Sequence, residues 1–148
     1  MTDPISIDAI PHRPPFRFVD EIVEVGDSLI KARTHVDPES DFFRGHYPGE
    51  PIMPGVLICE ACFQAGALLI AHRIGGYDPA RGVPVLTRIT DARFKRIVRP
   101  GETLDLEATI DEALPGAFFL TGRASVDGTL AVRVTFACML AKTETTPS

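Results

Sequence analysis

The sequence feature that most constrains the fold is a nearly uninterrupted apolar run, Val56–Ile74. Pro54-Gly55 precedes this run and Gly75-Gly76 follows it, and both pairs are typical of helix boundaries. Its apolar residues point in all directions around a helix, so we expect the helix to be buried on nearly every side. Four polar residues interrupt the run, which indicates a buried helix and no membrane span: Glu60, Gln64, His72 and Arg73.

A helix that is apolar all round requires a sheet to cover it, and the rest of the chain supplies strands. Alternating or β-branched segments predict strands at Phe16–Val25, Ser28–Val36, Val83–Lys95, Thr103–Asp111, Phe118–Val126 and Thr129–Leu140. Asp127-Gly128 is the clearest hairpin turn among them. We therefore predict an α+β fold in which an antiparallel sheet wraps around one long central helix. The open edges of such a sheet favour pairing with a second copy.

The composition limits the classes of function. The length of 148 residues suits a single domain spanning 1–148, with a polar tail at 141–148 that we expect to be disordered. The net charge of −5 argues against general nucleic-acid binding, because that requires an excess of Lys and Arg. Cys59, Cys62 and Cys138 are odd in number, and we expect buried free thiols in a reducing compartment. No basic stretch followed by an apolar run begins the chain, which favours a cytoplasmic location.

The candidate chemistry lies where a long loop meets the helix. Residues 37–54 are rich in proline and glycine, and a loop of that length in a small domain is usually functional. It carries His46 and leads into the helix N-terminus, where the amides near Gly55 and Val56 lack helical partners. Glu60 lies in the second helical turn, with Gln64 four residues further along the same face. A base, an acid and amide donors are the groups needed to remove a proton next to a carbonyl.

These residues also have purely structural interpretations. A Glu60 bonded to Gln64, or to backbone groups of the facing loop, explains the carboxylate about as well as catalysis does. His46 taken alone would most often be a loop histidine bonded to nearby carbonyls. No serine-nucleophile motif, glycine-rich nucleotide loop or His-rich metal spacing occurs in the sequence. The remaining histidines are expected to be structural or peripheral: His12, His35 and His72.

Four cations gather in one short segment of an otherwise acidic chain: Arg93, Lys95, Arg96 and Arg99. The simplest explanation is the solvated end of a strand. The functional interpretation is a docking patch for an acidic partner or a phosphate group. The segment is therefore a candidate interaction surface.

Three blocks of the sequence resemble the FabZ-type (3R)-hydroxyacyl-[acyl-carrier-protein] dehydratases of type II fatty acid synthesis. The blocks are Pro11–Phe16, Phe42–Gln64 and Ala92–Gly101, and they agree with that family in order and spacing. The middle block is the most specific, because it combines Gly-His-aromatic-Pro with Pro-Gly-Val-Leu-x-x-Glu-x-x-x-Gln. The resemblance extends over residues 8–140.

This resemblance implies a hot-dog fold and a homodimer whose two sheets join, in many members assembled further into a trimer of dimers. It implies that His46 of one subunit takes the α-proton while Glu60 of the other helps the 3-hydroxyl leave as water. The Gly55 amide would polarise the thioester carbonyl, and the product would be a trans-2-enoyl thioester. No metal or organic cofactor would take part. Glu60 stands where the dehydratase–isomerase group has Asp, which places the chain with the non-isomerising enzymes.

The resemblance also implies where the substrate lies. The acyl chain would occupy a tunnel beside the apolar helix. The substrate-binding residues would be Gly55, Val56, Phe63 and Gln64. The acidic acyl-carrier protein would dock on the basic segment Arg93–Arg99.

The chain departs from the family around the presumed tunnel. Tyr47 replaces the usual Phe, Pro14-Pro15 stands where Tyr-Pro is common, and Cys62-Phe63 puts a bulky residue where a small one is common. Val83–Asp91 lacks the aromatic residues often found there. These differences retain the acid and the base but leave the chain-length preference open. Two other functions also fit such a fold, namely a hot-dog acyl thioesterase and a non-catalytic acyl-binding subunit.

Overall fold

The computed structural model describes residues 5–142 and contains one six-stranded sheet and one long helix. In chain order, the elements are η1 Ile7–Ala9, β1 Glu21–Val25, β2 Leu29–His35, η2 Asp41–Arg44, α1 Gly55–Ile74, β3 Val83–Phe94, β4 Thr103–Leu114, β5 Ala117–Val126 and β6 Thr129–Ala141. The strands lie in the order β1-β2-β4-β5-β6-β3, and every neighbouring pair is antiparallel.

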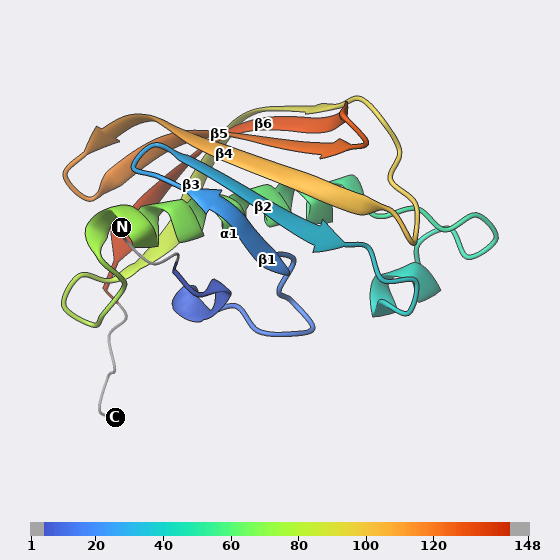
Figure 1. Cartoon of the computed structure of the whole chain (residues 1–148), viewed down its shortest axis with the longest axis horizontal. Helices are drawn as coiled ribbons and strands as arrows, with labels where there is room; N and C mark the ends of the chain where they lie inside the picture. The colour runs from blue at the N-terminus through green and yellow to red at the C-terminus, as the bar shows by residue number, and fades with distance from the viewer. Residues whose placement is uncertain (1–4, 143–148) are drawn as a thin grey trace.

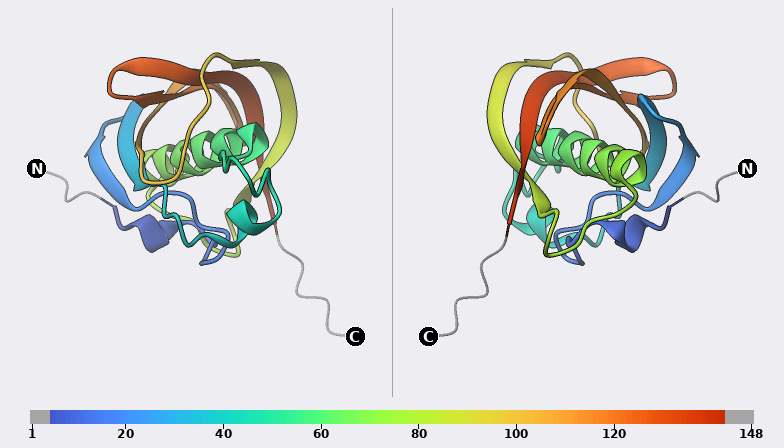
Figure 2. Two further views of the ribbon diagram at one scale, coloured as in Figure 1. Left: turned by 90° about the vertical axis from the view of Figure 1, so that its right-hand side faces the viewer. Right: turned by 90° about the vertical axis from the view of Figure 1, so that its left-hand side faces the viewer.

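The sheet curves over α1 and down both of its flanks (Figures 1 and 2). The segment carrying η1 and the loop carrying η2 lie on the side of α1 that faces away from the sheet (Figure 2). This arrangement confirms the predicted α+β hot-dog fold. It leaves the side of the helix opposite the sheet to be covered by irregular segments alone.

Helix α1 has the boundaries that its sequence predicts. Pro54 is its N-cap, and Gly75 ends it in the left-handed conformation (φ 83°), where its N–H bonds the carbonyl of Ala71. The helix is long and apolar enough to suit a membrane span, but 72% of its most apolar window is buried inside the fold. That burial is the state expected of a core helix.

Two glycines allow α1 to lie very close to the sheet. A Cβ atom on Gly122 of β5 would lie 2.7 Å from the Cβ of Cys62. A Cβ atom on Gly66 of α1 would lie 2.9 Å from Cζ of Phe136. Both distances are shorter than van der Waals contact, so the observed spacing between helix and sheet depends on these two glycines.

Helix α1 is covered on nearly every side, as expected, and one strip is the exception. Val56 is 71% exposed, and Glu60 and Phe63 are half-buried. These three residues follow the i, i+4, i+7 spacing that places side chains on one face of a helix. The physical reason is that a single curved sheet covers the top and flanks of a helix but not its underside.

The predicted strand Phe16–Val25 is correct only in its second half, because β1 begins at Glu21. The backbone of Phe18 instead donates to Oε1 of Gln64 on α1, and the carbonyl of Phe16 accepts from Nε2 of Gln64. The side-chain amide of Gln64 therefore takes the place of a neighbouring strand and holds this segment against the helix.

Smaller differences concern other element ends. The long loop contains the short helix η2, which the sequence does not predict. Strand β4 continues to Leu114, and β6 continues through Ala141 into the predicted tail. The rest of that tail, residues 143–148, lies outside the described residues.

Strand β3 forms one edge of the sheet and pairs only with β6 among the described strands. Its register shifts twice along β6, between Leu86 and Arg88 and between Ile89 and Asp91, and such irregularities bend a strand. The edge is apolar as well as open, because four of its large side chains are exposed: Val85, Leu86, Ile89 and Phe94. Such an edge favours pairing with another chain.

Replacing Gly122 with Ala should destabilise the fold by about 1–3 kcal/mol, because the new methyl group overlaps Cys62. Denaturant unfolding at a fixed protein concentration would measure the loss. Gly49→Ala is the matched control, because a Cβ there meets nothing within 4 Å. Equal stability of the two variants would contradict this account of the helix–sheet spacing.

Candidate active site

A cavity of about 530 Å³ opens between the long loop, the N-terminus of α1 and the segment that follows β3. Its lining combines one histidine, two cations and an apolar majority: His46, Ile52, Met53, Gly55, Val56, Ile58, Phe94, Lys95, Arg96, Ile97 and Val98. The structure thus brings together one predicted catalytic residue, His46, and two predicted substrate-binding residues, Gly55 and Val56. They come from a loop and a helix N-terminus that are consecutive in the chain.

The hydrogen bond that His46 makes defines its tautomer. Its Nδ1 lies 2.9 Å from the carbonyl oxygen of Ile52. Because a carbonyl oxygen only accepts, Nδ1 carries the proton, and in the neutral ring Nε2 then holds the free electron pair. His46 is therefore arranged to accept a proton at Nε2.

The loop around His46 is held by backbone contacts at both ends. The N–H of His46 bonds the carbonyl of Phe42, and the N–H of Met53 bonds the carbonyl of Val98. Tyr47 adopts a positive φ of 54°, which is unusual for a non-glycine residue. Its ring packs edge-on against the His46 ring, with the two ring centroids 4.7 Å apart. Strained residues of this kind persist where the surrounding structure enforces them, often at functional sites.

The first amides of α1 are free to bind a ligand. Within residues 5–142, no hydrogen bond is donated by the N–H groups of Gly55 and Val56. They carry the partial positive charge of the helix N-terminus and line the same cavity as His46. The ring of Phe94 packs closely on Gly55, since a Cβ at Gly55 would lie 2.6 Å from that ring. A developing negative charge on oxygen would be stabilised at this point.

Glu60 lies outside this cavity, on the half-covered strip of α1. Its side chain is 22% exposed, and its Oε2 accepts a hydrogen bond from Nε2 of Gln64 at 3.0 Å. No hydrogen bond to Oε1 is formed within the described part of the chain. The predicted Glu60–Gln64 pair therefore forms, and one oxygen of the carboxylate stays available.

Gln64 is fully buried, and both ends of its amide are engaged. Its Oε1 accepts from the N–H of Phe18 at 2.7 Å, and its Nε2 donates to the carbonyl of Phe16 at 2.9 Å as well as to Glu60. With 0% exposure, Gln64 has no surface to offer a substrate in this chain. These contacts give it the role of orienting Glu60.

His12 is a neighbour of Glu60 that the sequence reasoning assigned to a structural role. Its Nε2 lies 3.7 Å from Oε2 of Glu60, which is longer than a hydrogen bond. Its Nδ1 is buried and has no hydrogen-bond partner among residues 5–142. His12 belongs to the first block of the family resemblance, and membership of that block could have identified it as a candidate site residue.

Phe63 lies one turn beyond Glu60 on the same strip. It is half-buried, and its ring packs edge-to-face on Phe136 of β6, with centroids 4.7 Å apart. Of the predicted substrate-binding residues, Gly55 and Val56 therefore lie in the His46 cavity, whereas Phe63 lies further along the helix.

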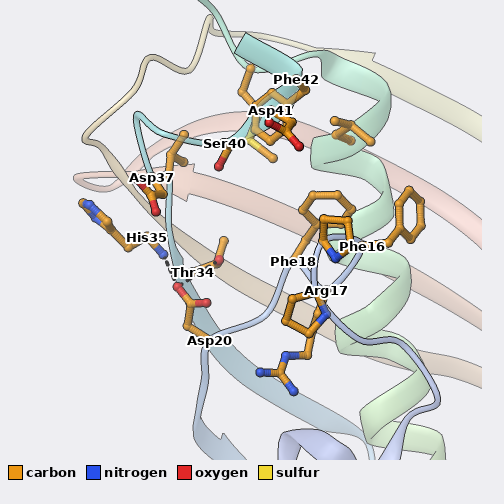
Figure 3. Close-up of a pocket in the computed structure, with 15 residues that line it drawn as sticks. Phe16, Arg17, Phe18, Asp20, Thr34, His35, Asp37, Ser40, Asp41 and Phe42 are labelled. Carbon is orange, nitrogen blue, oxygen red and sulfur yellow. Dashed lines mark hydrogen bonds between the residues drawn. The ribbon is translucent and has the colours of Figure 1, made fainter. Parts of the chain in front are cut away.

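A second cavity of about 460 Å³ contains neither predicted catalytic residue. Figure 3 shows Phe16 and Phe18 on its helix side, and Asp20, Thr34 and His35 on the opposite side. The carboxylate there is already engaged, because Oδ2 of Asp20 accepts from the backbone N–H of His35 and from the hydroxyl of Thr34. The segment Phe16–Phe18 separates this cavity from Gln64.

The four predicted docking cations differ in their electrostatic surroundings. Arg96 makes two hydrogen bonds to the Glu102 carboxylate, which raise the pKa of Arg96 and hold the pKa of Glu102 below its ordinary value. Arg93 pairs with Asp91 at 3.0 Å. Lys95 and Arg99 are exposed and make no ion pair within the described residues. Lys95 lines the His46 cavity, and Arg99 lines a shallow neighbouring pocket with Tyr47.

The cysteines are buried free thiols, as predicted. Burial raises the pKa of Cys59 and Cys62, and it raises the pKa of Cys138 to about 12. Thiols in this state are poor nucleophiles at neutral pH. Residues 5–142 contain no group of three or more His, Cys, Asp or Glu side chains that could hold a metal ion.

Comparisons with known proteins match most of the chain. A family model described as "FabA-like domain" matches residues 10–135. The protein named 3-hydroxyacyl-[acyl-carrier-protein] dehydratase FabZ from Erwinia tasmaniensis is 38% identical over 133 residues, which cover 89% of this chain and 87% of that protein. Its namesake from Verminephrobacter eiseniae is 40% identical, with 88% of each chain covered.

Solved structures agree on the fold alone. A chain of the dehydratase heterocomplex ApeI:P from Xenorhabdus doucetiae matches with a TM-score of 0.78 at 19% identity, over 93% of this chain and 91% of that one. A hypothetical thioesterase from Streptococcus pneumoniae, solved with coenzyme A, matches with a TM-score of 0.65 at 13% identity, over 84% and 90%. Dehydratases and thioesterases therefore both occur on this architecture, and the fold does not distinguish them.

Replacing Gln64 with Leu should destabilise the protein by about 2–4 kcal/mol, because it leaves the buried N–H of Phe18 and carbonyl of Phe16 without partners. Thermal and denaturant unfolding would measure the loss. Thr129→Val, a polar-to-apolar change at an exposed site, is the control and should alter stability by less than about 0.5 kcal/mol. A Gln64→Leu variant as stable as the control would contradict the proposal that Gln64 holds the Phe16–Phe18 segment against the helix.

Proposed function

Since the chain belongs to the FabZ-type dehydratase family, a group of hydro-lyases, we propose that it removes water from a (3R)-hydroxyacyl thioester carried on acyl-carrier protein. The product is the trans-2-enoyl thioester, and the setting is fatty acid synthesis or a related lipid pathway in the cytoplasm. The observation that carries the proposal is the fixed tautomer of His46 beside two free helix amides.

In the proposed reaction, Nε2 of His46 removes the proton from the carbon next to the thioester carbonyl. The negative charge that develops on the carbonyl oxygen is stabilised by the free amides at Gly55 and Val56. Glu60, as the carboxylic acid, gives its proton to the departing 3-hydroxyl, which leaves as water. One C–H bond and one C–O bond break, and a C=C bond forms. Proton exchange with solvent then restores both residues, and no cofactor is required.

We propose that each site uses His46 of one subunit and Glu60 of its partner in a homodimer. Three features support this arrangement. Glu60 does not line the cavity that contains His46. The strip of α1 that carries Glu60 is only half covered in the single chain. The edge strand β3 is open and apolar, and its last residue, Phe94, lies at the His46 cavity. Assembly into a trimer of dimers stays a prediction from the resemblance.

The acyl-carrier protein is proposed to dock beside the cavity mouth. All four cations of the segment are candidates, namely Arg93, Lys95, Arg96 and Arg99. Lys95 and Arg99 are the stronger candidates, because the charges of Arg93 and Arg96 are already balanced by Asp91 and Glu102. A thioesterase or a non-catalytic acyl-binding subunit is less consistent with family membership and with a histidine arranged to accept a proton.

His46→Ala and Glu60→Gln should each lower kcat/KM for dehydration of 3-hydroxybutanoyl thioester by about 10²–10⁴-fold, because each removes one proton-transfer group. Enoyl absorbance would follow the reaction, and a thiol reagent would detect hydrolysis in parallel. His35→Ala and Glu39→Gln, at exposed sites, are the controls and should retain activity. Free thiol without enoyl product would favour the thioesterase, and binding without turnover would favour the non-catalytic subunit.

Mixing the two inactive variants should restore part of the activity. A dimer with one His46→Ala subunit and one Glu60→Gln subunit contains one intact site and one doubly damaged site. Subunit exchange after mild denaturation and refolding would produce it. Mixtures that stay as inactive as their components, although subunit exchange is demonstrated with distinguishable tags, would overturn the shared site.

Charge reversal of Lys95 and Arg99 together should raise KM for the acyl-carrier-protein substrate several-fold, while kcat/KM for the matching N-acetylcysteamine thioester, which carries no phosphate, changes little. Loss of two exposed charges weakens encounter with an acidic partner, and added salt should reduce the difference. The double reversal of Lys31 and Arg123, on the outer face of the sheet, is the control. An equal loss for both substrates would argue against a docking role.

A further inference from the structure

A shallow pocket of about 310 Å³ lies beside the His46 cavity and continues its surface. We call it the Tyr47 pocket, and it is lined by Tyr47, Glu50, Ile52, Ile97 and Arg99. Ile52 and Ile97 line both the pocket and the cavity. A molecule bound in the cavity can therefore extend into the Tyr47 pocket along the surface of the same chain.

The side chain of Tyr47 is held at the junction of the two spaces. Its positive φ and the edge-on contact of its ring with the His46 ring fix its direction. The N–H of Glu50 bonds the carbonyl of Tyr47 at 2.9 Å, which closes the turn between these residues. Tyr47 is 63% exposed, and its hydroxyl makes no hydrogen bond within residues 5–142. A fixed aromatic side chain thus presents a free hydroxyl next to the proposed base.

The lining of the Tyr47 pocket is complementary to a pantetheine arm. This arm joins the thioester sulfur to the carrier, and it contains amides, a hydroxyl, a dimethyl carbon and a terminal phosphate. The Tyr47 hydroxyl can donate to an amide carbonyl, and the Glu50 carboxylate can accept from an amide N–H. The Arg99 guanidinium can bind the phosphate. Ile52 and Ile97 offer apolar contact to the carbon atoms of the arm.

The proposed shared site determines the direction in which the arm leaves. The thioester carbonyl is placed at the amides of Gly55 and Val56, and the 3-hydroxyl faces Glu60 of the partner subunit. The acyl side of the thioester therefore points toward the partner. The sulfur and its arm are left to follow the surface of the chain that supplies His46, and the Tyr47 pocket continues that surface.

The second cavity, which shares Met53 with the His46 cavity, is less suited to the arm. It is lined by three carboxylates and by one cation that already pairs with Asp8: Asp20, Asp37, Asp41 and Arg17. A phosphate would be repelled there. In the Tyr47 pocket, by contrast, Arg99 makes no ion pair within the described residues.

We propose that the Tyr47 pocket binds the pantetheine arm of the substrate, with the Tyr47 hydroxyl donating to an amide carbonyl and Arg99 contacting the phosphate. This inference rests on the proposed function and identifies the surface that recognises the non-reacting part of the substrate. The Phe that is usual at this position in the family has no hydroxyl. The contact made by Tyr47 is therefore a property of this chain.

The test compares 3-hydroxybutanoyl esters of three thiols, using the full-length protein. Ethanethiol has no arm, N-acetylcysteamine has one amide, and pantetheine has both amides. Tyr47→Phe keeps the ring against His46 and removes only the hydroxyl. We expect kcat/KM for the pantetheine thioester to fall about three- to tenfold, as for one lost hydrogen bond, and the ethanethiol value to stay within about twofold.

The N-acetylcysteamine thioester identifies which amide Tyr47 binds, because a loss with this substrate assigns the first amide and no loss assigns the second. Equal losses with all three thiols would show that the hydroxyl acts through His46. An unchanged value with pantetheine would show that the hydroxyl binds no part of the arm. Either of these two results would overturn the inference.

Arg99→Gln tests the other end of the arm. It should raise KM for the 4′-phosphopantetheine thioester several-fold and leave KM for the pantetheine thioester within about twofold, because only the first carries the phosphate. Arg44→Gln is the matched control, since Arg44 is exposed on the same loop as His46 and lines neither space. An equal response of both thioesters to Arg99→Gln would overturn the phosphate contact.

Failure of this inference is distinguishable from failure of the proposed function. Dehydration that proceeds equally well with and without an arm, in the wild-type protein and in Tyr47→Phe, overturns only the arm site. Absence of dehydration with every thioester, including the acyl-carrier-protein substrate, overturns the proposed function as well. Dehydration that improves with the arm and loses this gain in Tyr47→Phe supports both.

Discussion

The burial of α1 is the constraint on which the rest of the structure depends. The helix has 20 residues with apolar side chains all round, and the sheet and neighbouring loops bury 12 of them. A single curved sheet cannot enclose a helix completely, so the strip with Val56, Glu60 and Phe63 is left half covered. The proposed acid lies on this strip, the amide donors lie at the helix N-terminus, and the proposed base, His46, lies in the loop just before it.

The proposed base and the proposed acid are held in place by different kinds of contact. His46 is oriented by a backbone carbonyl two residues before the helix N-cap, so its position is local to the loop. Glu60 is oriented by Gln64, whose amide also binds the Phe16–Phe18 segment. The base therefore depends on a local turn, whereas the acid depends on a contact between residues far apart in sequence. In the proposed dimer, these two independently built halves face each other.

Features encoded by neighbouring residues could be predicted from the sequence, and features set by distant contacts could not. The bounds of α1 follow from Pro54 and Gly75, and the inward faces of β2 and β4 follow from simple alternation. The start of β1 was wrong because Gln64, about 46 residues away, binds Phe18 in place of a strand. The edge position of β3 and the contact of His12 with Glu60 likewise depend on topology. His46, Gly55 and Val56 were grouped correctly because they are close in sequence.

The amide of Gln64 links the N-terminal segment to the orientation of Glu60, although the two are far apart in sequence. The same side chain that fixes the proposed acid is anchored by the backbone of Phe16 and Phe18. A fusion partner, cleavage event or crystal contact that displaces this segment would therefore also disturb the orientation of the Glu60 carboxylate. Protein intended for kinetic work is for this reason better tagged at its C-terminus.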